Sequence, residues 1–320
     1  MAKFILKRLL QAIPLLIVIS LLVFVLIQLA PFDVVDALIT PDMSPEMIAN
    51  LRYRYGLDQS VLTRYFNWLG NVLRGDFGRS LTTRVTIADE LAVRIPNTIR
   101  LVLPAYLFAL ILAISLGMVA GANRNRWPDK LIDGICSFGI ATPSFWVAML
   151  LIYVFGLQLG WFPIFGMYTV GGTREFADYL RHFMLPFITL TLAFFPSLTR
   201  YIRMSTIMQV EEDYVTIQKT FQASKWEIFT RHISRNVMIP IVTQIGMALP
   251  MLVTGAVITE SIFSWQGVGP YLMHAARTMD YPVIMALMLL SAILVILGNL
   301  LSDVLYSIVD PRIRKGGEGS

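Results

Sequence analysis

Long stretches without charged residues alternate with polar segments along the chain, and this pattern predicts membrane-spanning helices. Six stretches qualify, at residues 9–30, 101–122, 134–157, 183–199, 236–259 and 281–302. A helix rises about 1.5 Å per residue, so about 20 residues cross a hydrocarbon core of about 30 Å. The stretch at 183–199 is short. We expect its helix to continue past Arg200 and Arg203, whose long side chains can reach the lipid headgroups.

The polar segment between the first two predicted spans has the pattern of a small helical domain rather than a linker. A serine followed by proline predicts a helix over 44–56 that stops at a glycine. Apolar residues at helical spacing predict a second helix over 61–75. A threonine with an aspartate three residues later is a capping-box pattern that predicts a third helix over 86–96, ending at Pro96. We expect the aromatic stripe of 61–75 to pack into the domain's own core, with contact to a partner or to lipid headgroups as the alternatives.

Composition supports an integral membrane protein. Hydrophobic residues make up 56% of the 320 residues and charged residues 15%, against about 25% charged in soluble domains. The mean hydropathy of +0.66 means that much of the surface must face lipid. This excludes a disordered or nucleic-acid-coating protein. The single cysteine, Cys136, cannot form an internal disulfide and matches no zinc or redox spacing, so we expect it to be buried.

The distribution of Lys and Arg predicts the orientation in the membrane. With a cytoplasmic N-terminus, fifteen basic residues, including all six lysines, fall on the inside and three fall in the two short outside loops. The other eight lie in the long segment after the first span, and segments of that length cross the membrane regardless of charge. Both termini are therefore expected in the cytoplasm, with 311–320 as a frayed tail.

The motifs of catalysis and of metal or nucleotide binding are missing from the sequence. It contains no phosphate-binding loop, no H-E-x-x-H and no G-x-S-x-G. His182, His232 and His274 are expected in three separate loops, so we expect no metal site, no cofactor and no catalytic residue. The predicted spans also lack acidic and basic residues in their central stretches, which disfavours ion-driven transport. If the protein pumps anything, something else must supply the energy.

Residues 201–235, the coupling segment, could be the place where that energy enters. They are too apolar for an idle loop and too charged for a span. We predict two short helices separated by a break at Gln222-Ala223, with Ser224 and Glu227 as a capping box for the second helix. Aromatic residues at such a tip suit insertion into a groove on a partner protein or a hairpin lying on the membrane. Both interpretations stay open from these residues alone.

Ten stretches in one order along nearly the whole chain resemble the integral membrane permeases of bacterial ATP-binding-cassette (ABC) importers for oligopeptides and dipeptides. That family also includes nickel, glutathione and some oligosaccharide permeases. The matching stretches are KRLLQAIPLLIVIS, YGLDQSVLTRYFNWLGNVLRGDFGRSL, VRIPNTIRLVL, ATPSFWVAMLL, HFMLPFITL, EDYVTIQKTFQAS, RHISRNVMIP, ITESIFSWQGVGPYL, DYPVIMALMLL and DPRIR. The resemblance implies the first of two permease subunits, a multi-pass protein of the bacterial cytoplasmic (inner) membrane that is not itself an enzyme.

The resemblance also implies the partners: a second permease, two cytoplasmic ATPase subunits that hydrolyse ATP, and an extracytoplasmic substrate-binding protein. Membrane lipid surrounds the spans. The expected fold is all-α, with residues 1–30 as the tail and first span and 31–99 as an extracytoplasmic helical segment. Residues 100–310 form a five-helix core that contains the coupling segment, and 311–320 form the tail.

The family pattern points to the residues that couple the permease to its ATPase. Six candidates follow from their position in the family loop, and two aromatic residues are added because we expect them to be buried against the ATPase. The eight candidates are Glu212, Asp213, Tyr214, Phe221, Gln222, Ala223, Ser224 and Trp226. The chain departs from the family where small residues and a glycine are usual, at Gln218, Thr220 and Gln222. It also has Phe32 in place of a usual glycine and Gln266 in place of a usual proline.

The expected function is import of short peptides through a pathway shared with a second permease. Six helices are too few to enclose such a pathway, so we expect a second permease beside this chain. Small residues such as Gly117, Ala120 and Gly121 would allow its helices to approach closely. The alternative substrates are nickel, glutathione and oligosaccharides. A rival of another class is a channel or membrane scaffold without ATPase partners.

Overall fold

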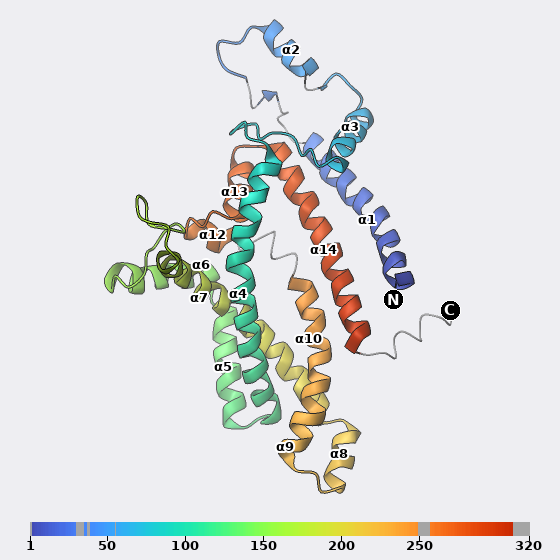
Figure 1. The fold of residues 1–320 in the computed structure, drawn as a ribbon, viewed down its shortest axis with the longest axis vertical. Coiled ribbons are helices and arrows are strands. Elements are labelled where there is room, and N and C mark those ends of the chain that lie inside the picture. The colour runs from blue at the N-terminus through green and yellow to red at the C-terminus, as the bar shows by residue number, and fades with distance from the viewer. Residues whose placement is uncertain (1, 30–34, 37–38, 55, 249–256, 310–320) are drawn as a thin grey trace.

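The computed structural model describes residues 2–29, 35–36, 39–54, 56–248 and 257–309. Every regular element within these residues is a helix, so the all-α prediction is confirmed. Figure 1 shows long helices running along the molecule, with short helices gathered at both ends and on one side. The longest are α1 (Ala2–Gln28), α4 (Ile87–Ala122), α7 (Phe176–Val210) and α14 (Tyr281–Val309).

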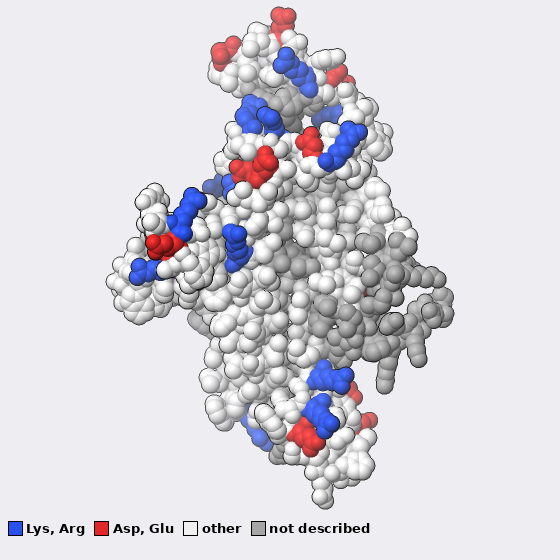
Figure 2. Space-filling view, viewed as in Figure 1, with Lys and Arg blue, Asp and Glu red and all other residues white. Residues whose placement is uncertain are grey.

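Four single helices in the described residues are long and apolar enough to cross a membrane: Leu10–Gln28, Ile87–Ala122, Phe176–Val210 and Tyr281–Val304. α7 continues past Arg200 and Arg203, as its short apolar stretch predicts, and holds two prolines within its length. The span predicted at 236–259 is covered by α10 (Ser234–Ala248) in its first half, and 249–256 lie outside the described residues. Figure 2 shows charged side chains mainly at the ends of the molecule and beside α6 and α7, with a largely uncharged surface between them.

The third predicted span is not a single helix. α5 (Trp127–Ala141) is followed by α6 (Ser144–Leu151) and the π-helix η2 (Ile152–Gln158), and the two parts meet at an angle of 95°. The break falls at Thr142-Pro143. Proline pushes the residue before it out of the helical region, and Thr142 accordingly has φ −90° and ψ 121°. The prediction of one helix over 134–157 is therefore wrong.

The second predicted span and the helix predicted over 86–96 form one element. α4 runs for 36 residues and contains Pro96, where the sequence pattern places a helix end. That predicted end is wrong, because a proline removes one N–H and the rest of a long packed helix can keep its hydrogen bonds. Thr86 lies at the N-cap, but its side chain makes no capping hydrogen bond, so the predicted capping box is also wrong. The predicted domain boundary at 99/100 falls within α4.

The first two helices predicted after the first span match their predictions. α2 covers Pro45–Arg54 and α3 covers Val61–Leu73, where the Ser60 hydroxyl accepts a hydrogen bond from Thr63 N at 3.2 Å. Tyr65 is buried, with its ring centroid 5.5 Å from that of Phe24 in α1. Tyr65 and Trp68 of the predicted stripe therefore pack into the protein's own core, whereas Phe66 is 64% exposed, so the prediction is confirmed only in part.

α4 and α7 form the most extensive helix pair of the described structure. A Cβ atom on Gly117 would lie 2.8 Å from Thr199 O, and one on Gly121 would lie 2.5 Å from Thr206 Cβ. Only glycine permits this approach. The small residues of α4 thus pack against a helix of the same chain, and the expectation that they serve the contact with a second permease is wrong.

The remaining elements are short or connect the long helices. α8 (Asp213–Thr220), α9 (Lys225–Glu227) and the π-helix η3 (Ile228–Ile233) lie between α7 and α10. α12 (Val257–Ile262) and α13 (Val268–Arg277) precede α14 and pack near the beginning of α4. Figure 1 places α8 and α9 at one end of the molecule and α2 and α3 at the other.

Candidate functional site

The coupling segment forms a projecting tip at the lower end of Figure 1. α7 ends at Val210, α8 begins at Asp213, and residues 221–224 separate α8 from α9. The predicted break at Gln222-Ala223 is confirmed. The predicted second short helix is instead the beginning of a longer one, because α9, η3 and α10 follow one another without interruption.

The turn after α8 has the geometry of a common helix ending. Gln222 has φ +57°, in the left-handed region that favours glycine. The next residue, Ala223, donates its N–H to Gln218 O at 3.1 Å, which satisfies a carbonyl near the end of α8. A glycine usually occupies this position in the family that the sequence resembles. The departure at Gln222 therefore changes the side chain and keeps the backbone form of the turn.

The start of α9 is fixed by a side-chain cap. Ser224 Oγ accepts a hydrogen bond from Glu227 N at 3.1 Å, as the S-x-x-E pattern predicts. The Glu227 carboxylate lies 3.7 Å from Arg231 Nη1, one helical turn further along. The turn thus stops one helix and starts the next within four residues.

The inner side of the tip is part of the main hydrophobic core. Val215 of α8 and Ile228 of η3 are buried in one cluster with Ile202 of α7 and Ile132 of α5. Tyr214 is half-buried against this cluster, and its hydroxyl donates to Gln209 Oε1 at 3.0 Å. Burial raises the pKa of the Tyr214 phenol, so the ring stays neutral at physiological pH. The tip is therefore tied to the long helices rather than loosely attached.

The outer side of the tip presents large apolar side chains to the surroundings. Phe221 is 78% exposed and Trp226 is 77% exposed, and Ile217 of α8 is also exposed. Of the eight candidate coupling residues, Tyr214 and Ala223 are half-buried, and six are exposed: Glu212, Asp213, Phe221, Gln222, Ser224 and Trp226. The structure thus brings all eight to one tip with an anchored inner side and an exposed aromatic outer side.

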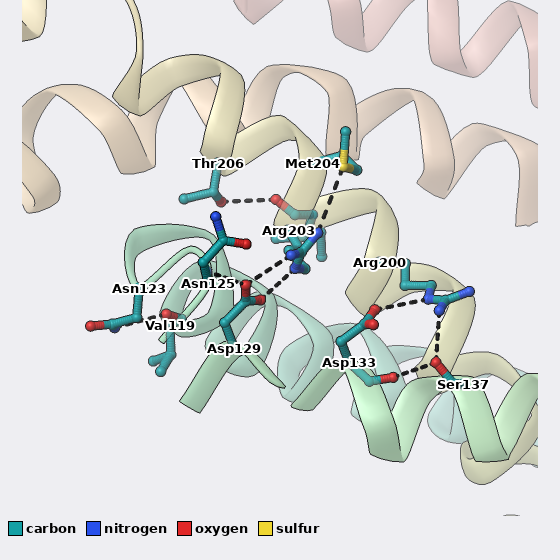
Figure 3. A network of polar contacts seen from close by, with 11 residues as sticks. Val119, Asn123, Asn125, Asp129, Asp133, Ser137, Arg200, Arg203, Met204 and Thr206 are labelled. Carbon is teal, nitrogen blue, oxygen red and sulfur yellow. Dashed lines mark hydrogen bonds and ion pairs between the residues drawn. The ribbon is translucent and has the colours of Figure 1, made fainter. Parts of the chain in front are cut away.

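Ion pairs join α5 to α7 just above this tip (Figure 3). Arg203 Nε lies 2.5 Å from Asp129 Oδ1 and Arg203 Nη2 lies 2.8 Å from Asp129 Oδ2. Asp129 also accepts a hydrogen bond from Asn125 N at 2.8 Å. Arg200 donates to Asp133 at 3.2 Å and to Ser137 at 2.8 Å. These contacts hold the end of α7, from which the coupling segment projects.

The sequence predicts that Arg200 and Arg203 reach lipid headgroups, but in the structure they pair with Asp133 and Asp129 of α5. The signal in the sequence is periodic: the two arginines are three residues apart, and Asp129 and Asp133 are four apart. Such spacings put each pair on one face of its helix. Only the packing of α5 on α7 shows that the two faces meet.

A second polar cluster joins the start of α4 to the loop between α12 and α13. The buried Glu260 accepts a hydrogen bond from Gly269 N at 2.8 Å, and Thr98 Oγ1 accepts one from Val268 N at 2.9 Å. A Cβ on Gly267 would lie 2.4 Å from Glu260 Oε2 and 2.5 Å from Thr98 Oγ1, so a larger residue here would displace these buried side chains. Gln266 contributes its main-chain carbonyl, which accepts from Asn97 at 2.9 Å. Proline, usual here in the family, supplies the same oxygen.

The described residues hold no group of three or more His, Cys, Asp or Glu side chains placed to bind a metal ion. The histidines lie in helical elements rather than in loops, which corrects the sequence expectation: His182 in α7, His232 in η3 and His274 in α13. His182 is buried, with Nδ1 2.9 Å from Asp178 O. Cys136 is buried, as expected.

Comparison with known proteins decides the family. The family model described as "Binding-protein-dependent transport system inner membrane component" matches residues 113–315, and the model of its N-terminal region matches residues 1–102. The chain belongs to this family. It is thus the multi-pass inner membrane component of a binding-protein-dependent transport system, and the resemblance drawn from the ten sequence stretches is confirmed.

Two curated relatives cover nearly the full length. The chain is 36% identical over 314 residues to oligopeptide transport system permease protein AppB of Bacillus subtilis (strain 168). It is 37% identical over 314 residues to glutathione transport system permease protein GsiC of Escherichia coli (strain K12). In both cases the match covers 98% of this chain and 99% of the relative. A transport permease of this family is not the catalytic subunit of its system.

Proposed function

We propose that the chain is one of two permease subunits of an ABC importer for short peptides, and that the coupling segment transmits ATP-driven movement to the spans. Two separate cytoplasmic ATPase subunits hydrolyse ATP, and an extracytoplasmic binding protein delivers the substrate. Both termini and the coupling segment lie in the cytoplasm. The distribution of basic residues in the sequence supports this orientation.

The observation that carries the proposal is the two-sided tip. Phe221 and Trp226 are more than three-quarters exposed, although large aromatic side chains are the most costly to leave in water. They flank a turn whose backbone is fixed by the Gln222 conformation and the Ser224 cap. Aromatic anchors on a preorganised element are the usual centre of a protein interface. A groove on the ATPase would cover them.

Movement can pass from the tip to the membrane through the buried side. The ATPases, closing on ATP, pull on the turn around Ala223. Val215 and Ile228 share a core with Ile202 of α7 and Ile132 of α5, so a displaced tip carries the ends of these helices with it. The Arg203–Asp129 pair makes α5 and α7 move together. A packed unit of this kind shifts between alternative arrangements rather than deforming gradually.

The relatives support peptides as the substrate class. One is named as an oligopeptide permease and the other as a glutathione permease, and glutathione is itself a small peptide. Both match the chain at nearly the same identity. Nickel and oligosaccharides are the alternative substrates.

Reconstitution tests the function. The chain is purified with a candidate second permease, ATPases and binding protein, and placed in proteoliposomes with labelled di- and oligopeptides, glutathione, nickel or an oligosaccharide outside. We expect ATP-dependent uptake of peptide that is lost when any one subunit is omitted. Uptake that needs no ATPase would show a channel, and uptake without the second permease would refute the paired pathway.

A further inference from the structure

A cavity of about 700 Å³ lies at the opposite end of the molecule from the coupling tip. Its walls come from the end of α1, the end of α2, the helix α3, the start of α14, and the loop at 76–84 that leads into α4. A volume of this size is in the range of cavities that hold small ligands. It is unrelated to the coupling segment and to the α5–α7 ion pairs.

The polar side of the cavity is strongly basic. Four arginines line it, Arg54, Arg64, Arg79 and Arg84, together with one acidic residue, Asp76. The Asp76 carboxylate stabilises its own loop: its Oδ1 accepts a hydrogen bond from Gly78 N at 2.8 Å. Among the described residues, no carboxylate forms an ion pair with Arg54, Arg79 or Arg84. The cavity therefore favours an anion. One guanidinium group can donate two parallel hydrogen bonds to two oxygens of a phosphate.

The other side of the cavity is apolar and continuous with the membrane spans. Phe24 and Ile27 come from α1, Trp68 from α3 and Met285 from α14. α1 carries exposed apolar side chains at the same level, including Leu26, which is 65% exposed. A ligand that fits both sides must have an anionic group next to hydrocarbon.

The loop that carries two of the arginines is held in place before any ligand arrives. Asp280, at the start of α14, is buried and accepts hydrogen bonds from Ser80 Oγ at 2.6 Å and Leu81 N at 3.1 Å. The two sides of the loop pair through Ser80 N to Val85 O at 3.0 Å. Arg79 and Arg84 thus stand on a rigid support, which lowers the entropic cost of binding.

We propose that this cavity binds the phosphate headgroup of an anionic phospholipid, such as phosphatidylglycerol, from the extracytoplasmic leaflet. The phosphate lies among the arginines, and the acyl chains continue along the exposed apolar face of α1. Free phosphate or a peptide carboxylate would satisfy the arginines but would leave the apolar wall unfilled. Basic pockets beside spanning helices recognise lipid headgroups by this combination of charge and apolar surface.

The test compares lipid retention by the full-length chain and its variants. R79Q/R84Q removes two charges from the cavity, and R74Q removes one from the same region outside it. Each protein is extracted from nanodiscs of phosphatidylglycerol and phosphatidylcholine, and bound lipid is counted by native mass spectrometry. We expect phosphatidylglycerol to be retained by the parent chain and by R74Q. The double variant should bind it about thirty-fold more weakly, and phosphatidylcholine should not substitute.

Two further measurements distinguish a lipid phosphate from a free anion and check that each variant is folded. Inorganic phosphate and a short acidic peptide are added as competitors, and thermal unfolding of each variant is recorded. Competition by millimolar phosphate with no retained lipid would assign the cavity to a free anion and overturn the lipid proposal. Equal retention of both lipids, or equal loss in R74Q and the double variant, would overturn it as well.

Discussion

The guanidinium of Arg203 in α7 donates hydrogen bonds to both carboxylate oxygens of Asp129 in α5, and the Asp129 side chain is only 3% exposed. The same carboxylate accepts the N–H of Asn125 at the turn between α4 and α5. One buried acid therefore joins three elements at the end of the molecule where the coupling segment begins. A second pair, Arg200 with Asp133, lies beside it on the same two helices but with both side chains over 40% exposed.

These two ion pairs predict different losses in the free energy of unfolding when the aspartate of each is replaced by asparagine. Asp129→Asn leaves the Arg203 guanidinium without its counter-charge in a largely buried place and should destabilise the chain by about 3 kcal/mol. Asp133→Asn breaks an exposed pair and should cost less than about 1 kcal/mol. Thermal unfolding in detergent measures both. Equal losses in the two variants would show that burial of the Asp129 pair contributes nothing.

The left-handed backbone of Gln222 predicts the effect of restoring the usual glycine. Gln222→Gly relieves a conformation that costs a side-chain-bearing residue about 1 kcal/mol, so the assembled complex should keep its ATPase activity. Gln222→Val, with a β-branched side chain in the same conformation, should weaken the turn and lower that activity. ATP hydrolysis of the two variants in nanodiscs gives the comparison. A glycine variant as impaired as the valine variant would contradict this account of the turn.

The cap on α9 can be tested by a conservative pair of variants. Ser224→Ala removes the oxygen that accepts from Glu227 N and should destabilise the start of α9 by about 1 kcal/mol. We expect lower substrate-stimulated ATP hydrolysis, while Ser224→Asp, which keeps a capping oxygen, should restore it. If the aspartate variant shows the same loss as alanine, the effect does not come from the cap.

Orientation is open to thiol labelling because Cys136 is the only cysteine and is buried. In a Cys136→Ala background, Ser60→Cys should react with an impermeant maleimide from outside sealed cells. Lys225→Cys should react only after the membrane is permeabilised. The reason is the excess of basic residues in the segments assigned to the cytoplasm. Labelling of position 225 in sealed cells would reverse the predicted topology.

At the coupling turn, local signals in the sequence predict the local structure, whereas the Thr86 capping pattern does not. The Ser224 cap and the break before it need only residues a few positions apart, and both are found where the sequence places them. Prolines are harder to interpret. Pro96 lies inside a 36-residue helix, whereas Pro143 marks a 95° bend, although both follow apolar or small residues. The packing of neighbouring helices decides between these outcomes, and it cannot be read from the residues beside each proline.

Contacts between distant residues are the part that sequence reasoning misses. Asp129 and Arg203 are 74 positions apart, and Ser80 and Asp280 are 200 apart. The glycines of α4 show the same limit, because a small-residue patch indicates close helix packing without naming the partner helix. In this chain the partner is α7. The eight candidate coupling residues come from the family pattern and from two aromatic residues of the segment, and the structure adds which of them are exposed.

The exposure of Phe221 and Trp226 makes the central claim directly measurable. A charge at either position should leave the fold intact, because neither side chain is buried in the chain itself. Phe221→Asp and Trp226→Asp are each purified from membranes together with the other subunits, and Val170→Asp, at a fully exposed external position, is the control. We expect each tip variant to bind the ATPase about thirty-fold more weakly than Val170→Asp does, the loss typical of an aromatic anchor. Full retention of ATPase and of stimulated ATP hydrolysis in both variants would contradict the account, and the tip would then be a hairpin on the membrane surface.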